Sequence, residues 1–479
     1  MYQPPIVNFP VFSVAWSEST SAGGDSTPAV LTAGGGGAGN TGVGNKISLI
    51  AVKGGVSQPS HAIAHELETS PETCNCVAAS ENGQLMAAAF GKSVRIYASN
   101  PSGFHQLAEV RADFAEKESG VNFMAFVDRK GSEGSGDRGN REAEGGVTLL
   151  ATGGEDGILR VWELRADARG GCSGGAGEAD QPPSLSVDLV RECKGHTKPV
   201  TCVRFHPSGL LILTASKDGT CRLWDCERGS EAALLPTTSG LPPSSAAAKA
   251  PVIMCRSCCF SPKNAAAIFS VQSGPRGNAY VTEWHYSVRR NDSGEGGVLC
   301  EVRPVKVSLA SPHPATSITV RGDGARLAVG NVEGTVLVYR LPGFAKVMEY
   351  PAHDLPVTGL GFAPTEAGSK LGGYDLLAGS ADYKITLFKS QGSAAKLAAR
   401  QTLVFLWSLI VFLFRAILWM VRTAVALALT VVPIVGLVTL VGAVLYYPEE
   451  LADVIRKLLP QEDGSGLEDT EEPAESTVA

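Results

Sequence analysis

The chain has 479 residues, of which 44% are hydrophobic, and a formal net charge of −7. This composition suits a globular protein with a large core and excludes a strongly basic nucleic-acid-binding protein. Most of the negative charge lies at the end of the chain, because residues 448–479 hold ten acidic and two basic side chains. The main body is therefore close to neutral.

All eleven cysteines lie before residue 301, and they do not form the dense framework of a small secreted domain. A reducing compartment is therefore expected. Cys255, Cys258 and Cys259 form a C-x-x-C-C motif, but no second pair with zinc spacing accompanies them. We interpret these three residues as apolar strand residues, with a metal site as the alternative.

Residues 34–45, with the sequence Gly-Gly-Gly-Gly-Ala-Gly-Asn-Thr-Gly-Val-Gly-Asn, separate two expected strands at 29–33 and 47–52. Seven of these twelve residues are glycine, which loses more backbone entropy on ordering than any other residue. A phosphate-binding loop is disfavoured, because a strand and not a helix N-terminus is expected to follow. Two interpretations remain: a disordered surface hairpin, or a shaped loop that contacts an ion or a partner.

One sequence repeat occupies residues 195–225. It begins with Gly-His, continues through an apolar strand and a Lys-Asp-Gly turn, and ends with Trp-Asp. These landmarks, in this order, are typical of a WD repeat. The resemblance to WD repeats implies a structural tetrad, a polar chain that joins the strands of one blade and consists of His196, Thr214, Asp218 and Trp224.

Six weaker copies of this strand and turn pattern surround the repeat. The seven units cover residues 11–52, 74–98, 149–164, 195–225, 253–286, 314–341 and 353–389. They predict an all-β fold, a seven-bladed WD-repeat β-propeller, whose closure removes exposed edge strands. The last unit lacks a strand, which residues 2–9 are expected to supply. Surface loops are expected at the polar insertions 129–146, 167–183, 227–250 and 289–297.

Residues 423–447 carry no charged side chain over 25 positions, which exceeds the roughly 20 residues needed to cross a bilayer. A transmembrane α-helix is predicted there. Residues 396–422 are expected to form an apolar helix at the membrane interface, with a two-span hairpin as the alternative. Basic residues precede the span and acidic residues follow it. This asymmetry favours a cytosolic propeller at 1–395 and a short lumenal tail at 448–479.

The propeller, the glycine-rich loop in its first blade and the C-terminal anchor together resemble the endoplasmic-reticulum guanine-nucleotide exchange factors of the COPII coat, the prolactin regulatory element-binding protein family. The most specific match is residues 33–46, which are similar to the potassium-binding loop of that family. The resemblance implies a single-pass protein of the endoplasmic reticulum membrane. Its expected activity is to promote GDP release and GTP loading on a Sar-type small GTPase, with COPII-associated proteins as further partners.

The resemblance also implies the site residues. A K⁺ ion is expected to be bound by oxygens among Gly36, Gly37, Ala38, Gly39 and Asn40. Asn45 is the leading candidate for a side chain that engages the GTPase; the alternative is a turn asparagine that opens the next strand. Nucleotide exchange needs no covalent catalysis, so the protein is expected to be an exchange factor and not an enzyme that catalyses a covalent reaction. The alternative function is a membrane-anchored WD-repeat scaffold without exchange activity.

Overall fold

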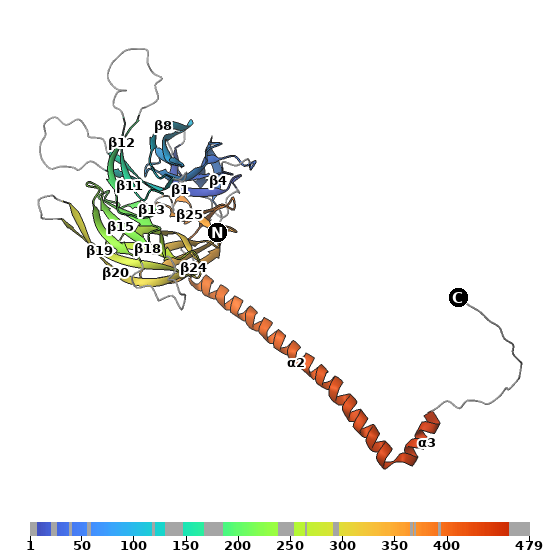
Figure 1. Ribbon diagram of the computed structural model, residues 1–479. Coiled ribbons are helices and arrows are strands. Elements are labelled where there is room, and N and C mark those ends of the chain that lie inside the picture. The colour runs from blue at the N-terminus through green and yellow to red at the C-terminus, as the bar shows by residue number, and fades with distance from the viewer. Residues whose placement is uncertain are drawn as a thin grey trace, which may run out of the picture. The chain divides into compact units, whose positions relative to one another are not determined.

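The computed structural model describes residues 7–20, 26–37, 41–54, 59–116, 120–129, 147–166, 185–237, 253–263, 266–290, 297–364, 367, 370–390 and 394–458. The chain divides into two compact units, Met1–Leu397 and Ala398–Ala479. The described strands all belong to the first unit, and the described part of the second unit is helical (Figure 1).

Seven antiparallel sheets form the first unit, and the strands of each sheet are neighbours in chain order. The first three sheets consist of β1 (Val11–Thr20), β2 (Ser26–Gly34), β3 (Lys46–Lys53) and β4 (Ser60–Glu68); β5 (Cys74–Ala79), β6 (Leu85–Phe90), β7 (Ser93–Asn100) and β8 (Gly103–Arg111); and β9 (Val121–Arg129), β10 (Val147–Gly154), β11 (Leu159–Ala166) and β12 (Leu185–Cys193).

The next three sheets also have four strands each, whereas the seventh has three. They consist of β13 (Val200–Phe205), β14 (Leu211–Ser216), β15 (Thr220–Asp225) and β16 (Glu231–Pro236); β17 (Met254–Phe260), β18 (Ala267–Ser273), β19 (Ala279–Arg290) and β20 (Val298–Ser311); β21 (Ala315–Val320), β22 (Arg326–Asn331), β23 (Thr335–Arg340) and β24 (Ala345–Pro351); and β25 (Val357–Phe362), β26 (Leu376–Ser380) and β27 (Ile385–Phe388).

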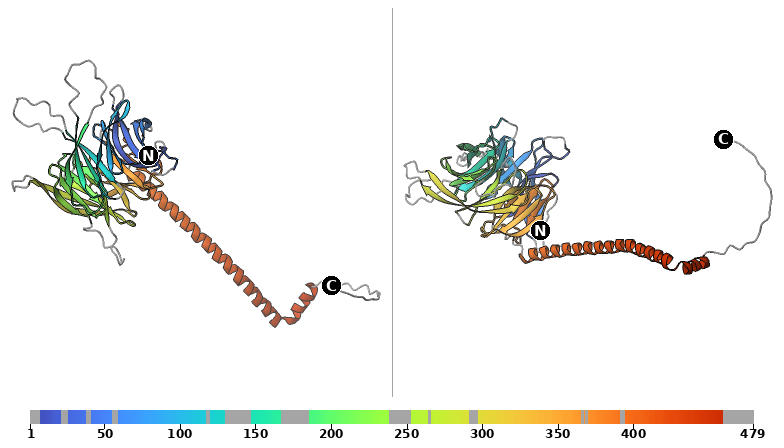
Figure 2. Two further views of the ribbon diagram at one scale, coloured as in Figure 1. Left: turned by 45° about the horizontal axis from the view of Figure 1, so that its top comes forward. Right: turned by 60° about the horizontal axis from the view of Figure 1, so that its bottom comes forward.

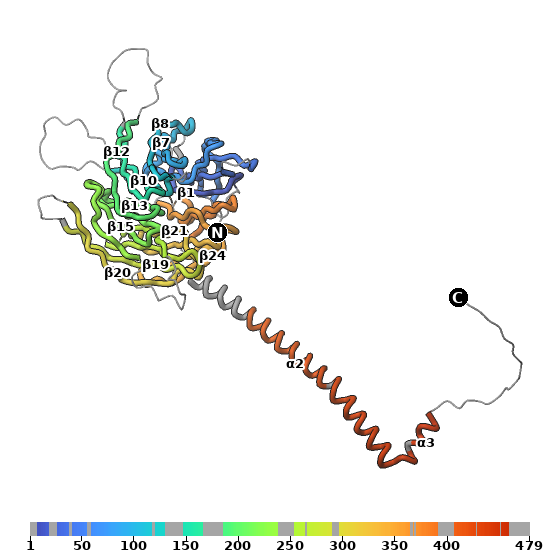
Figure 3. Tube along the Cα trace, viewed as in Figure 1, coloured from blue at the N-terminus to red at the C-terminus, as the bar shows by residue number. Residues whose placement is uncertain are grey.

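The sheets are arranged in a ring, as Figures 2 and 3 show. The first strand of each sheet contacts the first strand of the next, from β1 to β5 and onward to β25, which contacts β1 again. The predicted seven-bladed β-propeller is therefore confirmed. Because the blades pack face to face, strands in the middle of a sheet are covered on both sides. Every residue of β14, the second strand of its sheet, is buried, while the outer strand β8 has exposed positions.

Polar side chains join neighbouring blades at the inner strands. The ring closes where the Thr358 hydroxyl donates to the carbonyl of Val11 at 2.8 Å. The Thr201 hydroxyl makes the equivalent bond to the carbonyl of Cys255, also at 2.8 Å. Thr201 and Thr358 are each the extra residue of a β-bulge in the first strand of their sheet, where the bulge redirects the side chain.

The N-terminal segment packs against the three-stranded seventh blade. Val7 and Phe9 are buried in one apolar cluster with Ile385 and Leu387 of β27. Residues 7–10 form no strand, so the fourth strand expected from residues 2–9 is not formed by the described part of that segment. Residues 1–6 lie outside the described residues, as do most of the four predicted insertions. In the insertion 227–250 the expected loop is wrong at its start, because residues 231–236 form the strand β16.

Two helices follow the propeller: α2 (Ala394–Tyr446) and α3 (Pro448–Leu458). Residues 407–446 are long and apolar enough to cross a membrane by length and composition, and none of that window is buried. The separately expected segments 396–422 and 423–447 form one continuous helix, and no turn of the two-span hairpin interrupts it. Helix α3 lies within the segment 448–479 that was expected to be a short lumenal tail, and no helix was predicted there. Residues 459–479 lie outside the described part.

Candidate functional site

The glycine-rich loop connects β2 to β3 in the first blade. The two strands pair as far as Gly34 and Lys46, so residues 35–45 connect their ends. Gly35 and Gly37 adopt φ angles of +146° and +83°, values that favour glycine. A Cβ atom on Gly35 would lie 2.1 Å from Oδ1 of Asn45, so this position also requires glycine for lack of space.

Asn45 holds the loop from inside. Its Oδ1 accepts a hydrogen bond from the backbone N–H of Gly37 at 3.0 Å, and its Nδ2 donates to the carbonyls of Gly37 and Pro71, each at 3.1 Å. The residue is only 2% exposed. Asn45 therefore braces the loop in this structure, and its expected role in engaging the GTPase stays a prediction.

Further hydrogen bonds connect Asn45 to the end of β4, the outer strand of the blade. The backbone N–H of Asn45 donates to the Ser70 hydroxyl at 2.9 Å, and that hydroxyl donates to the carboxylate of Glu68 at 2.6 Å. Glu68 ends β4, and Lys46 at the start of β3 forms an ion pair with Glu66 of the same strand at 2.9 Å. The base of the loop is thus fixed to two strands of the first blade.

Two of the five residues expected to bind K⁺ are described by the structure. The carbonyl of Gly36 accepts from the Thr41 hydroxyl at 3.4 Å, and the carbonyl of Gly37 accepts from Nδ2 of Asn45. Each carbonyl oxygen has a second lone pair, so both fit the oxygen donors that K⁺ prefers. The other three expected ligands, Ala38, Gly39 and Asn40, lie outside the described residues.

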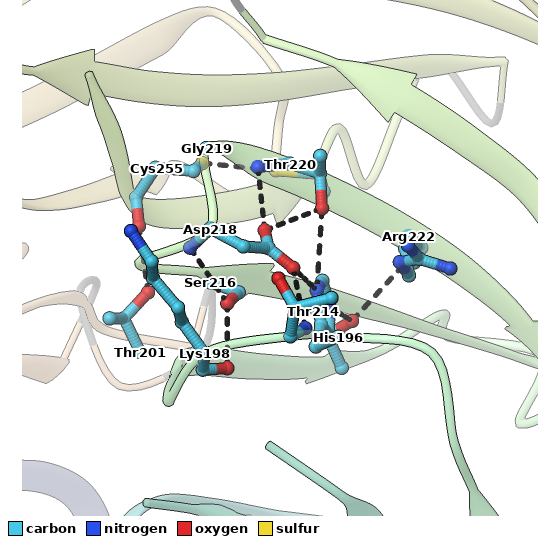
Figure 4. A network of polar contacts seen from close by, with 12 residues as sticks. His196, Lys198, Thr201, Thr214, Ser216, Asp218, Gly219, Thr220, Arg222 and Cys255 are labelled. Carbon is cyan, nitrogen blue, oxygen red and sulfur yellow. Dashed lines mark hydrogen bonds and ion pairs between the residues drawn. The ribbon is translucent and has the colours of Figure 1, made fainter. Parts of the chain in front are cut away.

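The structure brings together the four residues of the expected tetrad in the fourth blade. Figure 4 shows three of them, His196, Thr214 and Asp218. The ring nitrogens of His196 contact Asp218 Oδ2 at 2.9 Å and Thr214 Oγ1 at 2.8 Å, and Nε1 of Trp224 donates to Thr214 Oγ1 at 2.8 Å. Indole N–H only donates and a carboxylate only accepts. Nδ1 of His196 therefore carries a proton that it donates to Asp218, and the Thr214 hydroxyl accepts from the indole of Trp224.

The tetrad changes the titration of its carboxylate. Burial alone would raise the pKa of Asp218, but hydrogen bonds from His196, Thr220 and the backbone of Thr197 outweigh it and hold the pKa below its ordinary value. The Asp218 carboxylate therefore stays ionised and remains a hydrogen-bond acceptor for His196. This geometry supports a structural role for the tetrad, since its groups satisfy one another inside the blade.

The third blade contains a related network that the sequence analysis missed. Nε1 of Trp162 donates to the Thr152 hydroxyl at 3.0 Å, while Arg160 replaces a histidine as the partner of Asp156 at 2.6 Å. Arg160 is 2% exposed. The spacing of Thr152, Asp156 and Trp162 equals that of Thr214, Asp218 and Trp224, and this signal could have revealed the network.

The cysteines of the C-x-x-C-C motif lie in β17 and are buried. Sγ of Cys255 lies 3.0 Å from Sγ of Cys221 in the neighbouring blade. Burial raises the pKa of Cys255, Cys258 and Cys259 above the ordinary thiol value. Their burial in β17 agrees with strand packing. Within the described residues no group of three or more His, Cys, Asp or Glu side chains could hold a metal ion.

Comparisons with known proteins agree with this fold. Residues 187–225 match the family model described as WD domain, G-beta repeat. The chain is 33% identical over 82 residues to coronin-like protein crn1 of Schizosaccharomyces pombe, covering 17% of this chain and 12% of that protein. It is 25% identical over 218 residues to WD repeat-containing protein VIP3 of Arabidopsis thaliana, covering 46% of this chain and 56% of the relative.

A shorter match, 33% identical over 102 residues, is to eukaryotic translation initiation factor 3 subunit I of Homo sapiens, covering 21% of this chain and 24% of that protein. The chain thus spans at most about half the length of these three relatives. Among solved structures, Chaetomium thermophilum Sqt1 matches with a TM-score of 0.50 and 18% identity, over 82% of this chain and 85% of that one. That likeness concerns the fold alone. Fold and tetrad together define a seven-bladed β-propeller with a WD repeat.

Proposed function

We propose that this protein is a membrane-anchored WD-repeat scaffold that assembles other proteins. The observation that carries the proposal is the presence, in one chain, of a closed seven-bladed ring and a 40-residue apolar helical segment at 407–446. A closed propeller offers many loops on a rigid frame, which suits protein binding. The relatives match this chain through their WD repeats. They therefore support the propeller fold, and they give no support for exchange activity.

The anchor follows from the helix. At 1.5 Å per residue, a 40-residue helical segment is about 60 Å long, about twice the thickness of a hydrocarbon core. Its apolar side chains are exposed along its length, so water is a poor environment for it. Arg415 and Arg422 precede its second half. This basic side favours a cytosolic propeller, and the endoplasmic reticulum is the compartment that the family resemblance suggests.

A second candidate function is nucleotide exchange on a Sar-type small GTPase in COPII coat assembly. The observation that favours it is the bracing of the glycine-rich loop by Asn45, because a loop held in one shape can bind a deformed switch segment without first losing its own entropy. Binding a deformed GTPase necessarily weakens its affinity for nucleotide. A K⁺ ion held among the carbonyls of residues 36–40 would add further rigidity.

One exchange assay tests the second candidate directly. The full chain is placed in phosphatidylcholine vesicles, and release of a fluorescent GDP analogue from a Sar-type GTPase is followed in potassium and in sodium. Exchange activity predicts faster release that depends on potassium and falls in Asn45→Ala. The matched control is Asn278→Ala, an exposed turn asparagine in the fifth blade. An unaltered release rate with the wild-type chain would remove this candidate.

The scaffold proposal has its own test. Membranes carrying the full chain are crosslinked, dissolved in detergent and separated by size. A scaffold is expected to migrate in assemblies larger than itself, and carbonate washing is expected to leave it in the membrane. Migration as a free monomer would overturn assembly, and extraction by carbonate would overturn the anchor.

A further inference from the structure

Helix α3 is amphipathic and begins one residue after the apolar helix α2 ends. Glu449 and Glu450 lie in its first turn and Arg456 and Lys457 in its last turn, which places both charge signs at the favourable ends of the helix dipole. Pro448 starts the helix at a position where its missing N–H is not needed. The helix therefore has local reasons to form without packing against the propeller.

The apolar residues of α3 share one face. Val454, Ile455 and Leu458 follow the i, i+1, i+4 spacing of a single helix stripe and are 51%, 49% and 78% exposed. The opposite face is charged, as the exposed pair formed by Asp453 and Arg456 at 3.8 Å illustrates. An exposed apolar stripe beside a charged face is the pattern of helices that lie in a membrane interface.

We propose that α3 binds the surface of the lipid bilayer in which α2 is anchored. The inference rests on the proposed anchor, because α2 carries the chain to the membrane and only Tyr447 separates the two helices. Tyr446 and Tyr447 are 81% and 62% exposed, and tyrosine is enriched at membrane interfaces. The five charged residues of α3 sum to −1, so its binding is driven by apolar burial and does not require anionic lipid.

Surface binding by α3 also decides which part of α2 crosses the bilayer. If Tyr446 lies at one interface, Arg422 lies 24 residues away, about 36 Å along the helix. This distance slightly exceeds a hydrocarbon core of about 30 Å, so Arg422 reaches the opposite headgroups. The other apolar part of α2, residues 407–421, is then left outside the core on the propeller side, while Leu437 lies near the bilayer centre.

The test places one environment-sensitive NBD dye at a time on the full chain in phosphatidylcholine vesicles. Single cysteines replace Ile455 on the apolar face, Asp453 on the charged face as the matched control, Leu437 and Phe412. Cys172→Ala removes the cysteine that lies outside the described residues; the other ten are buried. We expect Ile455→Cys to be quenched by lipids with a shallow nitroxide and shielded from aqueous iodide. Asp453→Cys remains accessible to iodide, and Leu437→Cys is quenched by a deep nitroxide.

The outcomes separate this inference from the anchor itself. If Leu437→Cys is deep while Ile455→Cys is as accessible to iodide as Asp453→Cys, the anchor stands and the surface helix is overturned. If Ile455→Cys is shielded from iodide but not quenched by nitroxide lipids, protein and not lipid covers the stripe, which also overturns it. If the deep nitroxide quenches the dye at Phe412→Cys and not at Leu437→Cys, the assigned span is overturned. If iodide reaches the dye at both positions, the anchor is overturned.

Discussion

The side-chain amide of Asn45 is hydrogen bonded to both backbone polar groups of Gly37, at 3.0 Å to the N–H and 3.1 Å to the carbonyl. The amide thus pairs with Gly37 much as a neighbouring strand would. Because the same Nδ2 also donates to Pro71, one side chain joins the loop to the turn after β4. An effect of Asn45 on a partner protein would therefore act through the shape of the loop.

Replacing Asn45 by alanine is expected to lower the free energy of unfolding by about 1–3 kcal/mol, because buried partners lose their hydrogen bonds. Amide hydrogen exchange at Gly37 should become faster, and this rate measures the loop directly. Asn278→Ala should change neither quantity. Unchanged exchange at Gly37 in Asn45→Ala would show that the amide does not hold the loop.

The tetrad predicts a specific cost for losing one hydroxyl. Thr214→Val keeps the side-chain shape but leaves His196 and Trp224 without their shared partner. The free energy of unfolding should fall by about 2–4 kcal/mol, since each buried unsatisfied polar group costs about 1–3 kcal/mol. Chemical denaturation measures the loss. Thr214→Ser keeps the hydroxyl and should retain most of the stability; equal losses in the two variants would contradict the prediction.

The seventh blade predicts a dependence of stability on pH. Burial lowers the pKa of His353 below 6.5, although Asp382 opposes the shift. The unfolded chain therefore binds this proton at a higher pH than the folded chain does. The contribution to stability is complete above pH 6.5 and is lost as the pH falls through the lowered pKa of the folded state.

The prediction is checked by denaturation between pH 7.5 and pH 5. His353→Gln should give a shallower fall in the free energy of unfolding over this range than the wild type does. His313→Gln, at an exposed histidine, is the control. If His353→Gln leaves the slope unchanged, His353 does not contribute to the pH dependence.

The buried cysteines should resist alkylation. Burial raises the pKa of Cys76 and of Cys300 to about 11, so few thiolates of these two residues exist at neutral pH. Hydrogen bonds with neighbouring cysteines lower the pKa of Cys202 and Cys221 despite their burial, so these two thiols are protected by lack of access to the reagent. In a Cys172→Ala background, the native protein should take up almost no maleimide over minutes, whereas the chain unfolded in denaturant should take up ten equivalents by mass spectrometry. Rapid labelling of the native form would contradict the burial of these ten thiols.

Ring closure predicts that a polar contact between distant segments stabilises the whole propeller. Thr358→Val removes the bonds of its hydroxyl to the carbonyls of Val11 and Gly379. We expect a loss of about 1 kcal/mol in the free energy of unfolding, because the single hydroxyl proton is shared between the two carbonyls and a hydrogen bond contributes about 1 kcal/mol. Thr148→Val, which removes a hydroxyl bond to Asp128 within a single blade, serves for comparison, and an equal loss there would argue against a closure effect.

The seven blades could be predicted because each repeat carries its own strand and turn pattern, even where the Trp-Asp ending is lost. Residues 253–286 illustrate this: apolar alternation alone placed the fifth blade. Local pattern could not show that Arg160 is buried with Asp156, because that choice depends on neighbouring strands. Nor could it show α3, because an 11-residue segment within an acidic tail is short for a helix signal.

The sequence by itself determined the number of blades, the position of the glycine-rich loop and the apolar character of the C-terminal helix, because these depend on residue types and spacings along the chain. Only the tertiary structure decided what Asn45 does. Its amide points inward because Gly37 and Pro71 come within hydrogen-bond distance from other parts of the fold. A side chain's partners are set by contacts between distant segments, and spacing in the sequence does not encode those contacts directly.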